Sequence, residues 1–212
     1  MWLTLFPLYC NLTERKNKIK KTWLLGDYSM VSITLKKHDR NYTEVISSLT
    51  SNPQVQEALG LNWQQVSING TRDYIDFIQG EERMGNQLSR VIFNEHEKLI
   101  GIITLKSIDR QAKTAHVGTW IGAQYWGKGY NELAKKEMFK IAFEQLQLEL
   151  VFAGATLSNQ RSIAAQKKLP YITLDVGGYY PIELENIEKE TKESCILNVV
   201  EKQTFLNYLR NK

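Results

Sequence analysis

The segment GAQYWGKGYNELAKKE, residues 122–137, has the residue types and spacing of a loop that binds phosphate. Gly122, Gly127 and Lys128 are spaced as in a nucleoside-triphosphate P-loop, but that motif continues with a serine or threonine that binds Mg²⁺. This chain has Gly129 at that position. We therefore expect the loop either to hold a phosphate without a metal ion or to hold no phosphate.

The glycines of this loop are compatible with a metal-free diphosphate site. Gly127 and Gly129 lie where a predicted strand meets a predicted helix, and glycine allows the backbone to approach a ligand closely. The first turn of a helix offers unpaired N–H groups and the positive end of the helix dipole, and Lys128 could add a charge. The alternative is a tight turn that binds nothing. A Rossmann dinucleotide loop is disfavoured because Glu132 occupies the position of its third glycine.

Composition and charge exclude several other classes of protein. Of the 212 residues, 42% are hydrophobic and 24% charged, and the net charge of +4 is dispersed along the sequence. Dispersed basic residues do not support nucleic-acid binding, and no apolar run is long enough to cross a membrane. Two distant cysteines and three histidines without metal-ligand spacing predict neither a disulfide framework nor a zinc site, so no metal is expected.

The first 29 residues are set apart from the rest of the chain. Their apolar stretch precedes their basic stretch, which is the reverse of a secretory signal, so we expect a cytoplasmic protein with reduced thiols. Residues 1–29 are an N-terminal extension: an extra packed segment, a mobile arm or the product of an upstream start codon. One domain is predicted over residues 30–212.

Alternating patterns and β-branched residues predict seven strands. They cover residues 31–38, 89–95, 98–109, 114–123, 148–155, 172–176 and 195–201. An acidic loop is predicted between the last two strands. Helices are predicted after the first, fourth and fifth strands, giving the order βααβββαβαββ. This order indicates an α/β fold in which a mixed sheet carries helices on both faces.

The predicted helices cover residues 41–50, 71–85, 129–146 and 159–169. Asn52-Pro53 is expected to close the first, and the second is expected to end near Gly85. The third is amphipathic, with Lys135 on its polar side together with Lys136, Lys140 and Glu144. Ser158 or Asn159 can cap the fourth, which Pro170 stops.

Two motifs in this framework resemble those of a known family. QYWGKGYNELA, after the strand HVGTWIGA, resembles the acyl-CoA loop of the GNAT superfamily of N-acetyltransferases, Q/R-x-x-G-x-G/A. SNQRSIAAQKKLPYI resembles the second signature of its Rim-type branch, the ribosomal-protein N-terminal acetyltransferases and their relatives. The matching positions are Gln124, Gly127 and Gly129, then Asn159, Ser162, Lys168 and Leu169; Pro170 and Tyr171 replace the usual Gly-Phe. The resemblance covers about residues 31–200.

The resemblance implies a fold, a cofactor and its binding residues. The fold would be a GNAT-type mixed, mostly antiparallel, splayed central sheet with helices on both faces. The cofactor would be acetyl-CoA, used as a co-substrate without a metal, and its pantetheine arm would pair with backbone groups of the strand before the loop. The expected cofactor residues are Trp120, Ile121, Gly122, Gln124, Gly127, Lys128, Gly129, Tyr130, Asn131 and Asn159. Asn159 could instead only cap a helix.

The resemblance also suggests catalytic residues. Ser162 matches the serine to which the Rim-type branch assigns protonation of the leaving thiolate, and we expect it to donate a hydrogen bond to the sulfur. Gln166 stands where many members carry an acidic tyrosine, so Tyr171 or a water is the alternative. His116 occupies the position of a frequent glutamate base, and a histidine titrates near neutrality. Glu95, Asp109, a water relay or a purely structural His116 remain open.

The resulting hypothesis is a cytoplasmic N-acetyltransferase that moves an acetyl group from acetyl-CoA to a primary amine, directly, in a ternary complex. The acceptor would be a protein N-terminus or a small-molecule amine, and the protein a monomer or homodimer without nucleic-acid or membrane partners. Residues 183–193 could face a cationic acceptor or form a solvated acidic loop. The rivals are a non-catalytic acyl-CoA-binding sensor on the same fold and a P-loop nucleotide hydrolase.

Overall fold

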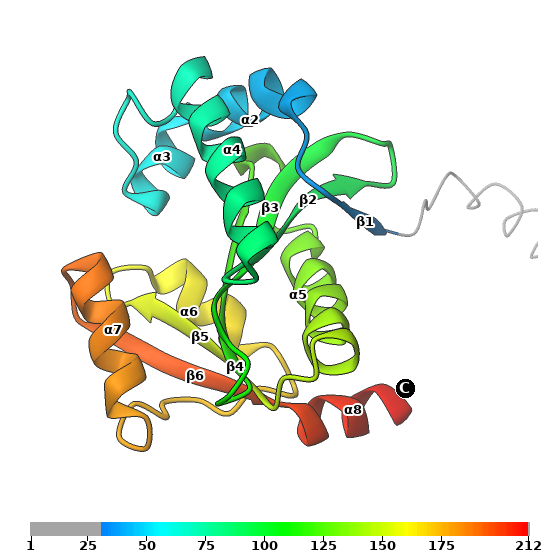
Figure 1. Ribbon diagram of the computed structural model, residues 1–212, viewed down its shortest axis with the longest axis vertical. Helices are drawn as coiled ribbons and strands as arrows, with labels where there is room; N and C mark the ends of the chain where they lie inside the picture. The colour runs from blue at the N-terminus through cyan, green and yellow to red at the C-terminus, as the bar shows by residue number, and fades with distance from the viewer. Residues whose placement is uncertain (1–30, 212) are drawn as a thin grey trace, which may run out of the picture. The chain divides into compact units, whose positions relative to one another are not determined.

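The computed structural model describes residues 31–211, and the prediction for residues 1–29 lies outside them. Six strands form one sheet in chain order (Figure 1). The strands are β1 (Ile33–Lys36), β2 (Leu88–Asn94), β3 (Leu99–Asp109), β4 (Thr114–Ile121), β5 (Leu150–Thr156) and β6 (Cys195–Glu201). All neighbours are antiparallel except β4 and β5, which are parallel. The predicted mixed, mostly antiparallel sheet is confirmed.

The parallel pair is short, and the sheet splays beyond it. β4 and β5 pair only where residues 114–116 lie beside residues 150–152. From there β4 continues beside β3 as far as Ile121, while β5 continues beside β6 as far as Thr156. The two strands therefore separate, and one edge of each is left without a strand partner.

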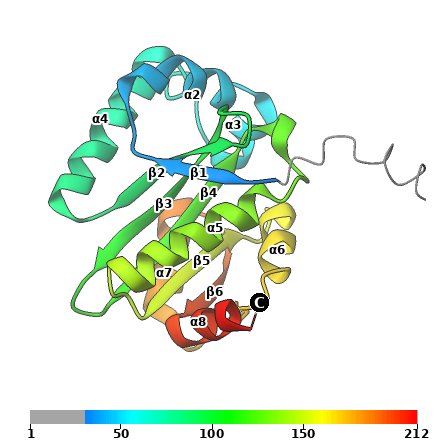
Figure 2. The ribbon, with the colours of Figure 1, turned by 90° about the vertical axis from the view of Figure 1, so that its right-hand side faces the viewer.

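Helices cover both faces of the sheet (Figure 2). They are α2 (Thr43–Thr50), α3 (Pro53–Leu59), α4 (Ile68–Met84), α5 (Tyr130–Lys140), α6 (Gln160–Lys167), α7 (Pro181–Thr191) and α8 (Lys202–Arg210), with short 3₁₀ turns Arg40–Tyr42 and Ala123–Tyr125 and a π-helical turn Ile141–Gln145 after α5. α5 and α8 pack on one face through the largest core cluster, which includes Phe139 and Phe205. On the other face, Trp120 of β4 contacts the cluster under α2 and α4, and His116 of β4 contacts α7.

The amino-terminal helices begin and end at residues suited to those positions. Asn52 does follow the end of α2, but its side chain caps a further helix, α3, by accepting a hydrogen bond from the Gln54 amide. Pro53 occupies the first position of α3, where its missing N–H costs nothing. Gly85 ends α4 in the left-handed conformation, as predicted. Reading Asn52-Pro53 only as a stop therefore missed α3.

The predictions after α6 were less accurate. Residues 172–176 form no strand: Thr173 makes a single bridge to Val199, and Asp175 has a left-handed φ of 54° that interrupts an extended conformation. The predicted acidic loop is helix α7, which begins with Pro181 and buries Ile187 against the sheet. α8 was not predicted.

Candidate functional site

A cavity of about 480 Å³ lies where β4 and β5 separate. Its walls come from α3, the end of β4, the loop before α5, the first turns of α5, and α6. Its charged lining residues are Lys135, Arg161, Lys168 and the single acid Glu132. A cavity of this size is typical of a small-molecule site, and its excess of positive charge suits an anionic ligand.

The glycine loop forms one end of this cavity. Gly127 and Gly129 line it with left-handed φ values of 76° and 85°. Gly129 is the N-cap residue of α5, and no side chain caps this helix. The N–H groups of the first turn are therefore left for a ligand, and the helix dipole adds positive potential there.

The expected cofactor residues divide into two groups. Trp120, Ile121, Gly127, Gly129, Tyr130, Asn131 and Asn159 line the cavity, whereas Gly122, Gln124 and Lys128 do not. Gln124 and Lys128 are exposed, and the Lys128 ammonium lies 5.7 Å from the centre of the Tyr125 ring. The Gly122 amide donates a hydrogen bond to the Ile100 carbonyl at 2.8 Å, so it is already used within the sheet.

The register of β4 identifies the backbone groups that face the opening. Residues alternate along an antiparallel strand, so Trp120, like Gly122, directs its backbone groups toward β3. Thr119 and Ile121 direct theirs toward the separated edge, where the Ile121 carbonyl accepts a hydrogen bond from the Trp126 indole at 2.6 Å. The Thr119 hydroxyl is buried there and has no hydrogen-bond partner among the described residues. Thr119 was not predicted, and its backbone groups are better placed to reach a ligand at this edge than those of Trp120 or Gly122.

Lys135 is buried in the cavity wall rather than on the polar side of α5. It is 6% exposed, and burial lowers the pKa of its ammonium to about 8. Within residues 31–211 it forms no ion pair. One turn earlier, the side-chain oxygen of Asn131 is buried and likewise has no hydrogen-bond partner in this part of the chain. Buried polar groups normally have partners, so this wall is suited to a polar ligand.

Arg161 adds a second cation to the wall. Its guanidinium lies 3.4 Å from the centre of the Trp126 ring, a cation–π contact between α6 and the loop. The contact fixes a positive charge beside Ser162, which lines the same cavity. Arg161 was not predicted as a site residue. Its position inside the second signature segment is the sequence signal from which it could have been found.

α6 places Ser162 through two contacts. The Asn159 side-chain oxygen accepts a hydrogen bond from the Ser162 amide at 3.0 Å, so Asn159 caps this helix while also lining the cavity. The Ser162 hydroxyl oxygen accepts a hydrogen bond from the Gln166 amide nitrogen at 3.2 Å. Gln166 itself is buried and does not line the cavity.

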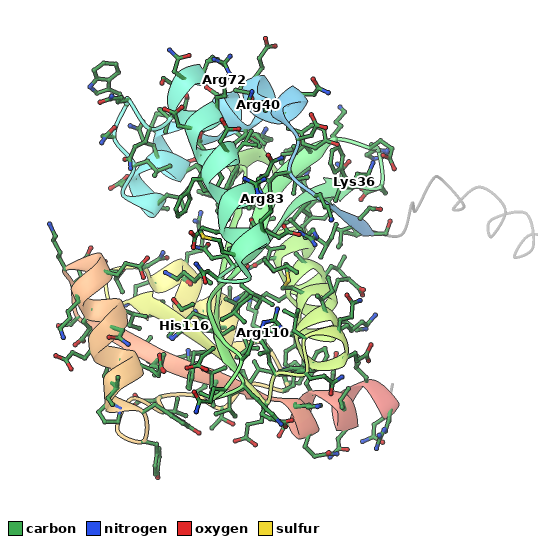
Figure 3. All side chains as sticks on the ribbon, viewed as in Figure 1. Lys36, Arg40, Arg72, Arg83, Arg110 and His116 are labelled. Carbon is green, nitrogen blue, oxygen red and sulfur yellow. The ribbon has the colours of Figure 1, made fainter. Side chains whose placement is uncertain are left out.

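His116 lies in a second cavity of about 120 Å³. This cavity is formed by residues 116–118 of β4, residues 154–156 of β5, and α7. Figure 3 labels His116 on the ribbon. His116 is 6% exposed, and its Nε2 lies 2.7 Å from Oε2 of Glu183 on α7. A carboxylate only accepts hydrogen bonds, so Nε2 carries the hydrogen and the lone pair of the neutral ring is on Nδ1. Nothing in the sequence paired Glu183 with His116, because the acidic segment was read as a loop.

The alternative acids and bases lie elsewhere. Glu95 accepts a hydrogen bond from the Tyr130 hydroxyl at 2.8 Å, and Asp109 accepts two backbone amides in the turn after β3. Tyr171 is buried in an aromatic cluster with Phe139, and burial raises the pKa of its hydroxyl above the usual value. None of the three lines either cavity.

Residues 31–211 contain neither a candidate metal cluster nor a helix that could span a membrane. No group of three or more His, Cys, Asp and Glu side chains there is placed to hold a metal ion. No helix in the same range is both long and apolar enough to span a bilayer.

Comparisons with known proteins agree with this geometry. The acetyltransferase (GNAT) domain family matches residues 33–171. A Bacillus licheniformis protein named "Uncharacterized N-acetyltransferase p20" is 26% identical over 141 residues, 66% of this chain and 78% of that protein.

Solved structures show the same fold. The microcin C7 self immunity acetyltransferase MccE, crystallised with acetyl-CoA and AMP, matches 80% of this chain and 91% of its own, with a TM-score of 0.63 and 20% identity. RimL, a ribosomal L7/L12 alpha-N-protein acetyltransferase, matches 68% and 78%, with a TM-score of 0.61 and 17% identity. The expected Rim-like GNAT architecture is confirmed, and the P-loop hydrolase is excluded. The chain belongs to the acetyltransferase (GNAT) domain family and is an acetyl-CoA-dependent acyltransferase.

Proposed function

We propose that this protein transfers the acetyl group of acetyl-CoA directly to a primary amine in a ternary complex. The carrying observation is that two cavities reach adjoining segments of β4 where the sheet opens, one at residues 119–121 and the other at residues 116–118. The larger contains the uncapped helix end and Ser162, and the smaller is lined by His116, whose Nε2 is bonded to Glu183 of α7. Two substrates could therefore approach one reaction point from two sides.

The larger cavity would hold acetyl-CoA. The diphosphate would accept hydrogen bonds from the backbone amides of Gly129, Tyr130 and Asn131 at the start of α5. Arg161 and Lys168 supply positive charge near α6. The pantetheine amides would meet the edge of β4 at Thr119 and Ile121, which has no strand partner.

The smaller cavity would hold the amine. An amine must lose a proton before it can attack, and Nδ1 of His116 would accept that proton directly or through a water. Glu183 would keep the other ring nitrogen protonated and stabilise the imidazolium that forms. The neutral nitrogen then forms a bond to the thioester carbonyl carbon, the carbon–sulfur bond breaks, and the nitrogen gives its second proton to water to leave a neutral amide.

Ser162 would act on the leaving group. The bond electrons move to sulfur when the carbon–sulfur bond breaks, and a hydrogen bond from the Ser162 hydroxyl would stabilise that charge. A serine hydroxyl is a weak acid, so the proton that neutralises the thiolate would come from water or from the imidazolium. No covalent acyl-enzyme is required.

The acceptor class follows from charge. Glu190 of α7 lines this cavity, where it is paired with Lys106 at 2.6 Å, and Glu183 of the same helix is bonded to His116. A primary amine is cationic in water, so the Glu183 and Glu190 carboxylates of α7 would attract it before deprotonation. A protein N-terminus or a small-molecule amine meets this requirement, and a cytoplasmic location suits both.

The test is a panel of amines with purified protein and acetyl-CoA, followed by thiol release and mass spectrometry of the products. We expect an acetylated amine in amounts equal to the released thiol. Tight acetyl-CoA binding without turnover on any peptide N-terminus, polyamine, amino acid or aminoglycoside would contradict the proposal and support a sensor.

A further inference from the structure

We propose that Gln166 and Asn198 are positioning residues that leave the hydrogen of the Ser162 hydroxyl free to point into the acetyl-CoA cavity. This inference rests on the proposed function for its catalytic meaning, but the orientation itself follows from hydrogen bonds alone. Three buried or half-buried side chains and one backbone amide form a chain of hydrogen bonds from β6 to α6.

The direction of the chain is set at its far end. The backbone amide of Asp175 can only donate, and it lies 2.8 Å from the side-chain oxygen of Asn198. The nitrogen of the Asn198 amide is therefore the atom that faces Gln166, at 2.7 Å from its side-chain oxygen. The Gln166 nitrogen must then face Ser162, to which it donates at 3.2 Å.

A second contact supports the same orientation independently. The Gln166 nitrogen also lies 3.5 Å from the backbone carbonyl of Gly154. A carbonyl oxygen can only accept, so the reversed amide would place two acceptors against each other. Both ends of the chain thus require one orientation of Gln166.

Burial keeps the chain in this state. Gln166 is 2% exposed and Asn198 is 1% exposed, so water has little access to compensate for a reversed amide. Reversal would break the hydrogen bonds at both ends and leave polar atoms unpaired, which is costly in the interior.

The consequence lies at the Ser162 hydroxyl. A hydroxyl has one hydrogen to donate and two lone pairs that accept. Because the Ser162 oxygen already accepts a hydrogen bond from Gln166, the hydroxyl hydrogen is not donated to Gln166. Ser162 lines the cavity, so the hydrogen is available to an acceptor there, which under the proposed function is the departing sulfur.

Asn198→Asp tests the chain by reversing its polarity without changing its shape. The new carboxylate still accepts from the Asp175 amide but can no longer donate to Gln166. Gln166 would turn its nitrogen toward residue 198 and its oxygen toward Ser162, and so capture the hydroxyl hydrogen. We expect kcat to fall by roughly tenfold to a hundredfold, the range for losing a hydrogen bond to a charged group, with little change in KM for acetyl-CoA.

Gln166→Glu is a second route to the same capture, and Gln166→Met is its matched control. The carboxylate accepts from Ser162, whereas the thioether leaves the hydroxyl hydrogen free, although it disrupts the chain more. We expect Gln166→Met to lower kcat less than Gln166→Glu. In a Ser162→Ala background, Asn198→Asp should cause no further loss. Equal further loss there, or the opposite ranking of the two Gln166 variants, would mean a structural role and overturn the proposal.

A measurement without turnover separates this inference from the proposed function. In NMR spectra of ¹⁵N-labelled wild type, the side-chain NH₂ of Gln166 should show nuclear Overhauser contacts to the Ser162 β-protons. In Asn198→Asp these contacts should move to the β-protons of residue 198. Gln166 contacts to residue 198 in the wild type would overturn the orientation, even if the protein acetylates amines. The wild-type pattern in a protein that acetylates nothing would confirm the orientation and contradict only the function.

Discussion

Oε2 of Glu183 on α7 lies 2.7 Å from Nε2 of His116 on β4, although the two residues are 67 positions apart in the sequence. The pair lies on the face of the sheet that carries α7, and the His116 ring also packs 5.3 Å from the ring of Phe152. Two constraints on one ring fix both its tautomer and its orientation. As the proposed base, His116 would need no rearrangement to receive a proton.

His116→Ala is expected to lower kcat by roughly a hundredfold at pH values below the acceptor's pKa, because general-base catalysis is lost there. The defect should shrink at higher pH, where the amine is already neutral. The check is a pH–rate profile beside Asp109→Asn, which removes a carboxylate outside both cavities. A profile identical to that of the wild type would exclude His116 as the base.

Gly129→Asp is expected to weaken acetyl-CoA binding by at least about a hundredfold, because a carboxylate would meet the diphosphate at the positive end of α5. Gly85→Asp is the matched control, since Gly85 has a similar left-handed φ of 80° but lies outside the cavity. Calorimetric titration of both variants measures the difference. Equal affinities would contradict the assignment of the loop.

Lys135→Met is expected to raise the free energy of unfolding at pH 7 by about 3 kcal/mol, the cost of keeping a buried ammonium whose pKa falls from 10.5 to about 8. The sign follows from proton counts. Between pH 8 and 10.5 the unfolded wild type holds the proton that the folded protein has lost, so wild-type stability rises across this interval.

The advantage of Lys135→Met should therefore disappear above pH 10.5. Urea denaturation at several pH values measures it, without ligand. Lys136→Met removes a charge from the same helix but leaves Lys135 in place, and so controls for net charge. A constant difference between Lys135→Met and wild type at every pH would show that packing, not charge, causes the effect.

Gly101→Ala is expected to destabilise the protein by about 2 kcal/mol or more, because the added carbon would overlap the backbone oxygen of Trp120 on β4. Gly118→Ala adds the same carbon to the adjoining strand, where nothing lies within 4 Å. Thermal or urea unfolding should separate the two variants clearly. Similar stabilities would mean that the β3–β4 pair can move apart more readily than its register suggests.

The sequence predicted those elements whose pattern is local. Alternating, β-branched and apolar runs located β1 to β6 correctly, and Gly85 located the end of α4. The prediction failed where tertiary contacts decide. Residues 172–176 were predicted as a strand, yet Asp175 has a left-handed φ and its amide donates to the Asn198 side chain. The segment of α7 is so acidic that its apolar contact through Ile187 was overlooked.

The candidate site was likewise predicted only where its residues lie in contiguous motifs. The loop glycines, Asn159 and Ser162 belong to contiguous motifs, and the structure brings them around one cavity. Lys135 was placed on the polar side of α5 because charged residues usually face water. Glu183 could not be paired with His116, since only the packing of α7 makes them neighbours.

The family match ends at Tyr171. Glu183, which is bonded to His116, and Asn198, which is bonded to Gln166, both come after it. The residues proposed to hold coenzyme A precede that point, whereas Glu183 and Asn198, proposed to prepare His116 and Ser162, follow it. Grafting the carboxy-terminal portion of one relative onto another should accordingly alter turnover while sparing cofactor capture.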